Sequence, residues 1–528
     1  MANTDTKNKR GNWNSKLGFI LAASGSAIGL GNIVFFSANA YAYGGGAFYL
    51  PYLFALFAVG IPVMVLEFGL GTMTQSAFPK ALYKLTGRKG EFVGWWSLGS
   101  ALFITMYYIT ILGWAAGMFF GSFGGLFEAG ATAPFTPMQD PTEGVSAMVY
   151  FFNLIATWWP LLGVLALWGV NLLILWKGTD TIEWAVRVAL PLMWLFMIIL
   201  IIRGLTLDGG FSGMMYLFTP DFEGIMQPEV WKGAFSQIFF TLSLGLGTMT
   251  AYASYLPKDS DTTNNSLVVS LLNCGFEFLA GIAIFSLLFA FAINPSGGTT
   301  LSLSFFAIPQ GISHFPTGVK IFGGLFFLLF LMAGVTSSIS LIEGPVSALR
   351  DKLGISRRKA LTMVSVPGII GSACFALPMI IDPNLSDNGT LGLTLLDILD
   401  HWAFSYSLLG VSFLECVMIG WVLGADKIRQ AVNANSTFTL GRWFNGLIKY
   451  VIPSLLGIVI LWNLYNEFNG DLYGANYALG GLNWIPYVIP IIWLLATFAI
   501  AFYLTFKSTY DIEPDSDILP SAPETSKN

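Results

Sequence analysis

The sequence of 528 residues is 55% hydrophobic and only 10% charged, and its mean hydropathy is +0.68. Soluble domains carry roughly 25% charged residues, so this composition is typical of a polytopic membrane protein and excludes an ordinary soluble enzyme. The net charge of -5 offers no basic surface to a phosphate backbone, and nucleic acid is not an expected partner. Three scattered cysteines and two histidines supply neither a zinc site nor a Ser/His/Asp triad, so no enzyme activity is expected.

Cutting the chain at charges, prolines and glycine clusters predicts twelve apolar spans, because a bilayer needs about 20 residues per helix. The first two share the uncharged run from Leu17 to Leu66 and are divided at Tyr43-Gly44-Gly45-Gly46. The other predicted spans lie near 92–125, 148–176, 181–203, 233–256, 266–294, 321–348, 360–381, 396–423, 450–466 and 484–506. The expected fold class is an all-α integral membrane protein with 12 transmembrane helices.

The positions of lysine and arginine predict the orientation, since positive flanks stay in the cytoplasm. With the N-terminus inside, 22 of the 25 positive residues fall on one side, and only Arg203, Lys232 and Lys320 lie on the other. We therefore expect a multi-pass protein of the cell's inner (plasma) membrane, surrounded by lipid, with both termini cytoplasmic. The polar start argues against a cleaved signal peptide, and the acidic tail after Lys507 is expected to be disordered.

Two spans contain paired glycines and lie five spans apart, at Gly25–Asn32 and Phe240–Gly247. Each glycine weakens a helix by about 1 kcal/mol relative to alanine, so local unwinding is plausible there. Glycines also permit close helix packing without any site, but paired broken spans indicate the binding site of a transporter. Polar residues near the breaks favour a site whose oxygen atoms suit an alkali cation: Asn32, Thr241, Ser243, Asn273 and Thr336-Ser337-Ser338.

Three carboxylates, Glu67, Glu277 and Glu415, lie within apolar runs. An ionisable group at membrane depth is functional by default, although Glu67 and Glu415 could equally be neutral, hydrogen-bonded structural groups. Glu277 follows Asn273 by four residues, about one helical turn, which places it on the same face as a proposed cation ligand.

Several spaced motifs match one family. They are Trp13, Ala27-Ile28-Gly29-Leu30-Gly31-Asn32, Gly44-Gly45-Gly46-Ala47-Phe48, Gln237-Ile238-Phe239-Phe240-Thr241-Leu242-Ser243, Thr336-Ser337-Ser338 and Gly424-Ala425-Asp426-Lys427. From about Arg10 to Tyr503 the chain resembles the neurotransmitter:sodium symporter family, in particular bacterial amino-acid members similar to LeuT.

The resemblance implies a LeuT-type 5+5 inverted repeat with unwound helices 1 and 6. It divides the chain into a cytoplasmic N-terminal segment with inner-gate residues (1–16), a first inverted repeat of helices 1–5 (17–203), a second repeat of helices 6–10 (204–424), helices 11 and 12 (425–506) and the cytoplasmic tail (507–528).

The resemblance also implies two sodium ions as cofactors. The first would be held by Ala27, Asn32, Thr241 and Asn273 together with the substrate carboxylate, and the second by Gly25, Ile28, Ala333, Thr336 and Ser337. Because the carboxylate and the first ion would share a site, substrate and sodium would bind more tightly together than apart.

The implied substrate site is mostly apolar. Tyr108 matches the tyrosine that holds the substrate carboxylate, and Gly29 lies where monoamine carriers place an aspartate, so the substrate is expected to bring its own carboxylate. The substrate-binding residues carried over are Ser26, Ala27, Gly29, Leu30, Gly31, Ile104, Tyr108, Phe240, Thr241, Ser243, Leu246, Ser337 and Leu341.

Two gates follow from the same resemblance. The inner gate would use Arg10, Trp13, Tyr255 and Asp351. In the outer gate, Phe35 replaces the family arginine while its acidic partner remains as Asp400, so we expect closure by aromatic packing. The alternative is that Lys320 or protonated His401 reaches Asp400 and restores a polar gate.

Glu277 matches a position where chloride-independent bacterial members place a carboxylate, which implies that chloride is not required and that this group couples charge or protons. We therefore expect a sodium-coupled symporter that imports a small neutral, aliphatic amino acid by alternating access, with a homodimer as a compatible assembly. Two alternatives remain: a sodium-coupled carrier of another carboxylated amine, and a solute sensor without stoichiometric transport.

Overall fold

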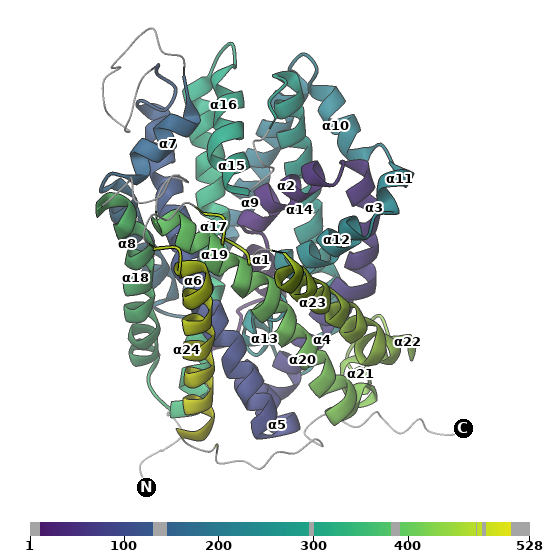
Figure 1. The fold of residues 1–528 in the computed structure, drawn as a ribbon. Helices are drawn as coiled ribbons and strands as arrows, with labels where there is room; N and C mark the ends of the chain where they lie inside the picture. The colour runs from purple at the N-terminus through teal and green to yellow at the C-terminus, as the bar shows by residue number, and fades with distance from the viewer. Residues whose placement is uncertain are drawn as a thin grey trace.

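The computed structural model describes residues 11–129, 145–294, 300–381, 391–470, 472–477, 482–507 and 510, and every regular element in these ranges is a helix. Within them, nine helices are long and apolar enough to cross a membrane, or eleven if two sharply bent helix pairs each count as one span. Figure 1 shows a bundle with α5 (Phe78–Thr86) at its lower end and α10 (Gly210–Phe218) and α16 (Ile308–Ser313) toward its upper end. The all-α membrane fold is confirmed.

The first part of the chain contains five spans. They are α1 (Lys16–Ala27) with a π-helical turn (Gly31–Phe35) and α2 (Phe36–Ala42), bent by 56°; α3 (Gly46–Ala55) with a π-helical turn (Leu56–Gly60) and α4 (Ile61–Thr74); α6 (Arg88–Phe123); α7 (Ala147–Ile155) with α8 (Trp159–Leu175), bent by 76°; and α9 (Thr179–Leu205).

The second part begins with α10, the short α11 (Phe222–Ile225) and a broken helix, α12 (Pro228–Thr241) and α13 (Thr248–Ala253), which corresponds to the predicted sixth span. It continues with α14 (Thr262–Ala290), α15 (Thr300–Ser302), a π-helical turn (Leu303–Ala307), α16, α17 (Val319–Leu353), α18 (Arg357–Ile381), α19 (Leu391–Trp402), a π-helical turn (Ala403–Leu408) and α20 (Leu409–Val417). The remaining elements are a π-helical turn (Met418–Gly424), α21 (Ala425–Asn433), α22 (Trp443–Gly446), a π-helical turn (Leu447–Val451), α23 (Ile452–Asn469) and α24 (Ile485–Lys507).

Both predicted breaks are present. In the first, Ile28 leaves the helical conformation, with φ -70° and ψ 95°, while its amide still donates to the Ser24 carbonyl at 2.7 Å. The second contains three residues with positive φ: Ser243 at 54°, Gly245 at 73° and Gly247 at 66°. Glycine adopts this conformation without the steric cost of a Cβ, so the glycines of span six lie where the helix must unwind.

The spans differ in how much of their surface other helices cover. In α6, α17 and the span formed by α3 and α4, 72% of the most apolar window is buried, against 22% in α9 and 28% in α24. The exposed leucines, isoleucines and phenylalanines of α9 and α24 face outward, as expected for helices in contact with lipid. The two breaks therefore lie beside central helices, away from hydrocarbon.

Candidate functional site

The two breaks contact each other inside the bundle. The Ser243 hydroxyl donates to the Ser26 carbonyl at 3.4 Å, and Gln237 on α12 donates to the Gly31 carbonyl at 3.5 Å. Gly31 packs so closely on Phe240 that a Cβ at this position would lie 2.5 Å from the ring. Backbone groups released by the first break thus find partners on the second, as the membrane interior requires.

Three of the residues assigned to the first sodium ion form one hydrogen-bonded chain. The side-chain amide of Asn32 donates to Asn273 Oδ1 at 2.7 Å, and the side-chain amide of Asn273 donates to the Thr241 hydroxyl at 2.9 Å. Asn32 Oδ1 accepts from the Gly29 amide at 2.7 Å. Ala27, the fourth predicted ligand, is buried at the end of α1. The structure therefore brings together, from α14 and from both breaks, residues whose oxygen atoms can coordinate a cation.

Glu277 lies beside this chain on α14 and is fully buried. Gln237 donates to its Oε1 at 2.7 Å, and the Tyr52 hydroxyl donates to its Oε2. The Thr241 hydroxyl also faces the Glu277 carboxyl group. A carboxyl group thus lies next to the predicted first sodium ligands.

The residues assigned to the second sodium ion meet between α1 and α17. The Ser337 hydroxyl lies 3.0 Å from the Ser26 carbonyl and 3.5 Å from the Ile28 carbonyl, and the Thr336 hydroxyl lies 3.0 Å from the Ala333 carbonyl. A Cβ on Gly25 would lie 3.5 Å from Thr336 Cβ, so these two residues are neighbours. Carbonyl and hydroxyl oxygens are hard ligands, so this donor set fits an alkali cation. Among the described residues, no cluster of His, Cys, Asp or Glu suits another metal.

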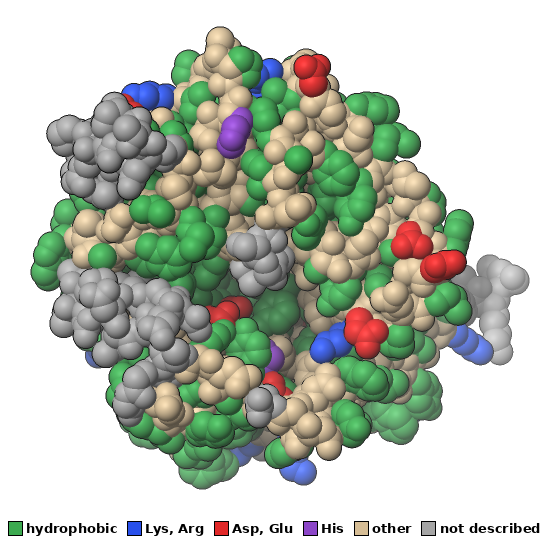
Figure 2. All heavy atoms as spheres, turned by 45° about the horizontal axis from the view of Figure 1, so that its top comes forward, with side chains coloured by type: hydrophobic (Ala, Val, Ile, Leu, Met, Phe, Trp, Pro, Cys, Tyr) green, Lys and Arg blue, Asp and Glu red, His purple; other side chains and the backbone are tan. Residues whose placement is uncertain are grey.

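A cavity of about 560 Å³ reaches four of the predicted substrate residues, Leu30, Ile104, Tyr108 and Phe240. Its inner end is polar at one point, where the Leu30 amide donates to the Tyr108 hydroxyl at 3.3 Å. Figure 2 shows a hollow on the upper face of the molecule with acidic side chains near its rim. The cavity therefore connects one end of the bundle with the first break.

Gly29 leaves no room for a side chain. A Cβ there would lie 2.5 Å from Ser337 Oγ and 3.0 Å from the Tyr108 hydroxyl oxygen. An aspartate at this position would have to displace both groups. Leu246 and Leu341 are each 6% exposed and do not line the cavity, so their assignment to the side-chain pocket stays a prediction.

At the outer end of the predicted site, aromatic rings lie edge to face. The rings of Phe35 and Phe240 are 4.6 Å apart, and those of Phe240 and Phe404 are 4.8 Å apart. A second cavity, of about 210 Å³, is lined by Phe35, Phe404, Lys232 and Asp400. Phe404 and Lys232 did not emerge from the sequence motifs, because they lie far along the chain from Phe35.

Asp400 has a neutral partner: the Tyr107 hydroxyl donates to its carboxylate at 2.6 Å. The alternative that Lys320 or protonated His401 pairs with Asp400 is wrong, since each of these two residues pairs with another acid. The pairs are Lys320 with Glu128 at 2.9 Å and His401 with Glu467 at 2.6 Å.

Trp13, which precedes α1, contacts α13 and the residue Tyr255 that follows it. Its indole donates to the Tyr252 carbonyl at 2.9 Å, and its ring meets the Tyr255 ring edge to face at 6.2 Å. Asp351 accepts from the Ala77 amide at 2.8 Å. Arg10, the fourth predicted inner-gate residue, lies outside the described residues.

Sequence motifs missed a buried ion pair near this gate. Arg357 forms two hydrogen bonds to Glu343, at 2.8 and 2.5 Å, and the Tyr255 hydroxyl donates to the same carboxylate at 2.6 Å. The presence of Glu343 in an apolar span was the available signal, because a carboxylate at membrane depth requires a partner.

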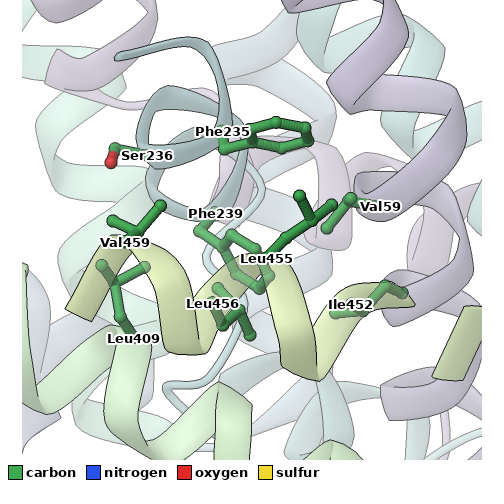
Figure 3. A pocket seen from close by; sticks show the side chains of 9 residues that line it. All are labelled: Val59, Phe235, Ser236, Phe239, Leu409, Ile452, Leu455, Leu456 and Val459. Carbon is green, nitrogen blue, oxygen red and sulfur yellow. The ribbon is translucent and has the colours of Figure 1, made fainter. Parts of the chain in front are cut away.

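A much smaller pocket lies between α12 and α23, where Figure 3 shows Phe235 and Phe239 close to Leu455 and Leu456. Its volume is about 10 Å³, which holds at most about one water molecule. Ser236 is its only polar lining residue. This pocket is a packing gap beside α12 and is too small for a substrate.

Comparison with known proteins agrees with this geometry. Residues 10–129 and 152–510 match the profile of the Sodium:neurotransmitter symporter family. A protein of Methanocaldococcus jannaschii described as an uncharacterized sodium-dependent transporter is 38% identical over 508 residues, which cover 92% of this chain and 97% of that protein. The human sodium- and chloride-dependent GABA transporter 2 is 30% identical, with 90% of this chain and 86% of that protein covered.

A solved structure, MhsT in complex with L-phenylalanine, superposes with a TM-score of 0.73 at 31% identity and covers 86% of this chain and 99% of MhsT. The matched profile spans most of the chain and includes both broken helices. The protein is therefore a membrane transporter and not an enzyme, and it belongs to the sodium:neurotransmitter symporter family.

Proposed function

We propose that this transporter couples sodium to the import of a small neutral, aliphatic amino acid and does not require chloride. The observation that carries the proposal is the cavity of about 560 Å³, which is apolar at Leu30, Ile104 and Phe240 and polar at the Tyr108 hydroxyl. The helix that restarts after the first break presents its amino end there, which favours a carboxylate. The binding of L-phenylalanine by MhsT supports an amino acid as the substrate.

A second candidate is another carboxylated amine, favoured by the similarity to the human GABA transporter 2. Gly29 lacks room for the aspartate that a substrate without a carboxylate would need, so both candidates carry their own acid group. Counterflow of labelled substrate in sealed vesicles separates either carrier from a sensor, which would show none.

We assign the two sodium ions to the oxygen donors around the first break. Asn32, Asn273 and Thr241 would hold one ion with the substrate carboxylate, and Thr336 and Ser337 would hold the other with nearby carbonyls. The short hydrogen bonds within each set support this assignment, because the same oxygens can turn toward a cation without large backbone movement. When bound, the first ion would offset the charge of the substrate carboxylate.

The gates and the orientation complete the proposal. Phe35 packed on Phe240 would close the outer path, and Trp13 packed on Tyr255 would close the inner path with Arg10 and Asp351. The end of the bundle that carries α5 would face the cytoplasm, since Lys80, Lys84, Arg88 and Lys89 gather there.

Charged amino acids should be poor ligands. The part of the cavity formed by Leu30, Ile104 and Phe240 offers no counter-charge, so a charged side chain there would lose its hydration at a cost of several kcal/mol. The two acids that also line this cavity, Asp397 and Asp400, belong to α19. We expect lysine and glutamate to compete at least roughly 100-fold more weakly than alanine, leucine or methionine in proteoliposomes. Tight binding of lysine or glutamate in a scintillation proximity assay would show that the pocket is assigned wrongly.

Sodium affinity should depend on the side-chain oxygens around the break. Replacing Asn32→Ala or Thr336→Ala removes one ligand and should raise the half-saturating sodium concentration by roughly tenfold, equivalent to about 1.4 kcal/mol. Thr110→Ala is a matched control, because that hydroxyl bonds only to the Met106 and Ser372 carbonyls. Undiminished uptake after potassium or choline replaces sodium would contradict the sodium assignment.

Chloride should not affect the wild type, because we assign the place of the anion to the Glu277 carboxyl group, which Gln237 and Tyr52 hold beside the proposed first sodium site. Uptake in chloride and in gluconate should be equal. Glu277→Ser should make uptake several-fold higher in chloride, whereas the exposed acid variant Glu128→Ser should stay insensitive. A wild-type protein that needs chloride would disprove this role for Glu277.

The outer gate should depend on aromatic contact. Phe35→Ala removes an edge-to-face pair worth about 0.5 to 1.5 kcal/mol, so uptake at equal surface expression should fall by up to roughly tenfold. Phe152→Ala is a suitable comparison, since Phe152 lines the same cavity but packs on Phe151 and Phe306. If Asp400→Asn abolishes uptake while Phe35→Ala leaves it intact, the gate is electrostatic.

A further inference from the structure

Two buried carboxyl groups lie next to the break of span six and have no part in the proposed function. They belong to Glu67 on α4 and Glu415 on α20, and both residues are 0% exposed. Glu67 Oε1 accepts from the Gly245 amide at 2.7 Å. Glu67 Oε2 and both oxygens of Glu415 have no hydrogen-bond partner among the described residues. Glu67 and α20 both reach Gly245, since a Cβ on Gly245 would also lie 2.2 Å from the hydroxyl of Ser412, one helical turn before Glu415.

The same place holds a third unsatisfied group. Ser412 precedes Glu415 by three residues on α20, so both side chains share one helix face. Its hydroxyl is buried and unpartnered, and a Cβ on Gly245 would lie 2.2 Å from it. Ser97 on α6 donates to the Gly245 carbonyl at 2.8 Å. Gly245 is therefore surrounded by polar side chains from α4, α6 and α20.

No cation compensates these carboxyl groups. In the described part of the chain, the titratable groups that interact with them are each other and the Cys416 thiol, while α6 contributes the neutral Ser97 and α13 the neutral Thr250. Other buried acids have basic partners: Glu91 lies 2.6 Å from Lys352, and both side chains are 0% exposed. Two negative charges in a medium of low dielectric constant, without a counter-charge, repel each other and lack hydration.

Binding of one proton to the pair removes this repulsion, because only one negative charge then remains. A protonated carboxyl group carries no charge and has an O–H donor that can serve an oxygen of the other carboxylate. We propose that Glu67 and Glu415 form a proton-binding site that holds one shared proton and attaches the break of span six to α4 and α20. The bound species is a proton taken from water, and on release it returns to water.

This site has a consequence for transport. Gly245 lies between Ser243 and Leu246, two of the proposed substrate residues, so a movement of the break changes both the proton site and the substrate site. If substrate binding alters proton affinity, the proton must alter substrate affinity by the same factor. This coupling rests on the proposed function, whereas occupancy of the site by a proton does not.

Infrared spectroscopy of the purified transporter tests the proton directly. We expect the carbonyl stretching band of a protonated carboxylic acid, shifted in heavy water, at neutral pH. Glu415→Gln and Glu67→Gln should each remove intensity equal to one carboxyl group, because an amide can donate to the remaining ionised carboxylate. Glu91→Gln should leave the band unchanged, since the Glu91 carboxylate is paired with Lys352.

The outcomes are distinct. Absence of the band in the wild type, or its survival in both Glu415→Gln and Glu67→Gln, overturns the proposal, and loss only in Glu277→Gln would place the proton elsewhere. The wild-type spectrum decides even if a variant fails to fold. In vesicles, an imposed pH gradient should change wild-type sodium-driven uptake and leave Glu415→Gln unchanged. An equal response of both would show that this proton is not coupled, without affecting the substrate assignment.

Discussion

Two spans of this transporter interrupt their backbone hydrogen bonds inside the bundle, and the released polar groups must find partners because hydrocarbon offers none. This constraint accounts for the arrangement of the central helices. The carbonyls of Ser26 and Ile28 meet the Ser337 hydroxyl of α17, and the amide and carbonyl of Gly245 meet Glu67 and Ser97. Some of the groups that satisfy the backbone are carbonyl and hydroxyl oxygens, the kind of ligand that suits an alkali cation.

Charges inside the bundle fall into two groups. Glu343 and Glu91 have basic partners, Arg357 and Lys352, at 2.5 and 2.6 Å, so each of these buried acids has an opposite charge beside it. The carboxyl groups around the breaks have only neutral donors: Tyr52 and Gln237 for Glu277, and backbone amide for Glu67. The acids at the two breaks therefore lack the opposite charge that Glu343 and Glu91 have.

The contacts at the upper and lower ends of the bundle differ in charge. At the upper end the contacts are neutral: aromatic edges at Phe35, Phe240 and Phe404, and a tyrosine hydroxyl on Asp400. At the lower end, Trp13 meets Tyr255, whose hydroxyl bonds to a carboxylate already held by Arg357. Neutral contacts are weaker than charge-assisted bonds, so the contacts at the upper end hold their helices together less strongly than those at the lower end.

Local features of the sequence were sufficient for the all-helical membrane fold, both breaks and the family, because apolar runs and paired glycines determine the local backbone conformation. The predicted count of twelve spans stays a prediction, since the described residues contain nine spanning helices, or eleven with the bent pairs. Local features also indicated which residues surround the breaks, since Asn32, Thr241 and Asn273 lie within recognisable motifs. Partners far apart along the chain depended on tertiary structure. Tyr107 and Asp400 are 293 residues apart, and no local pattern relates them. The same holds for Glu67, Gly245 and Glu415: the sequence showed two acids in apolar runs, but only the packing of α4 and α20 around one unwound turn brought them together without a counter-charge.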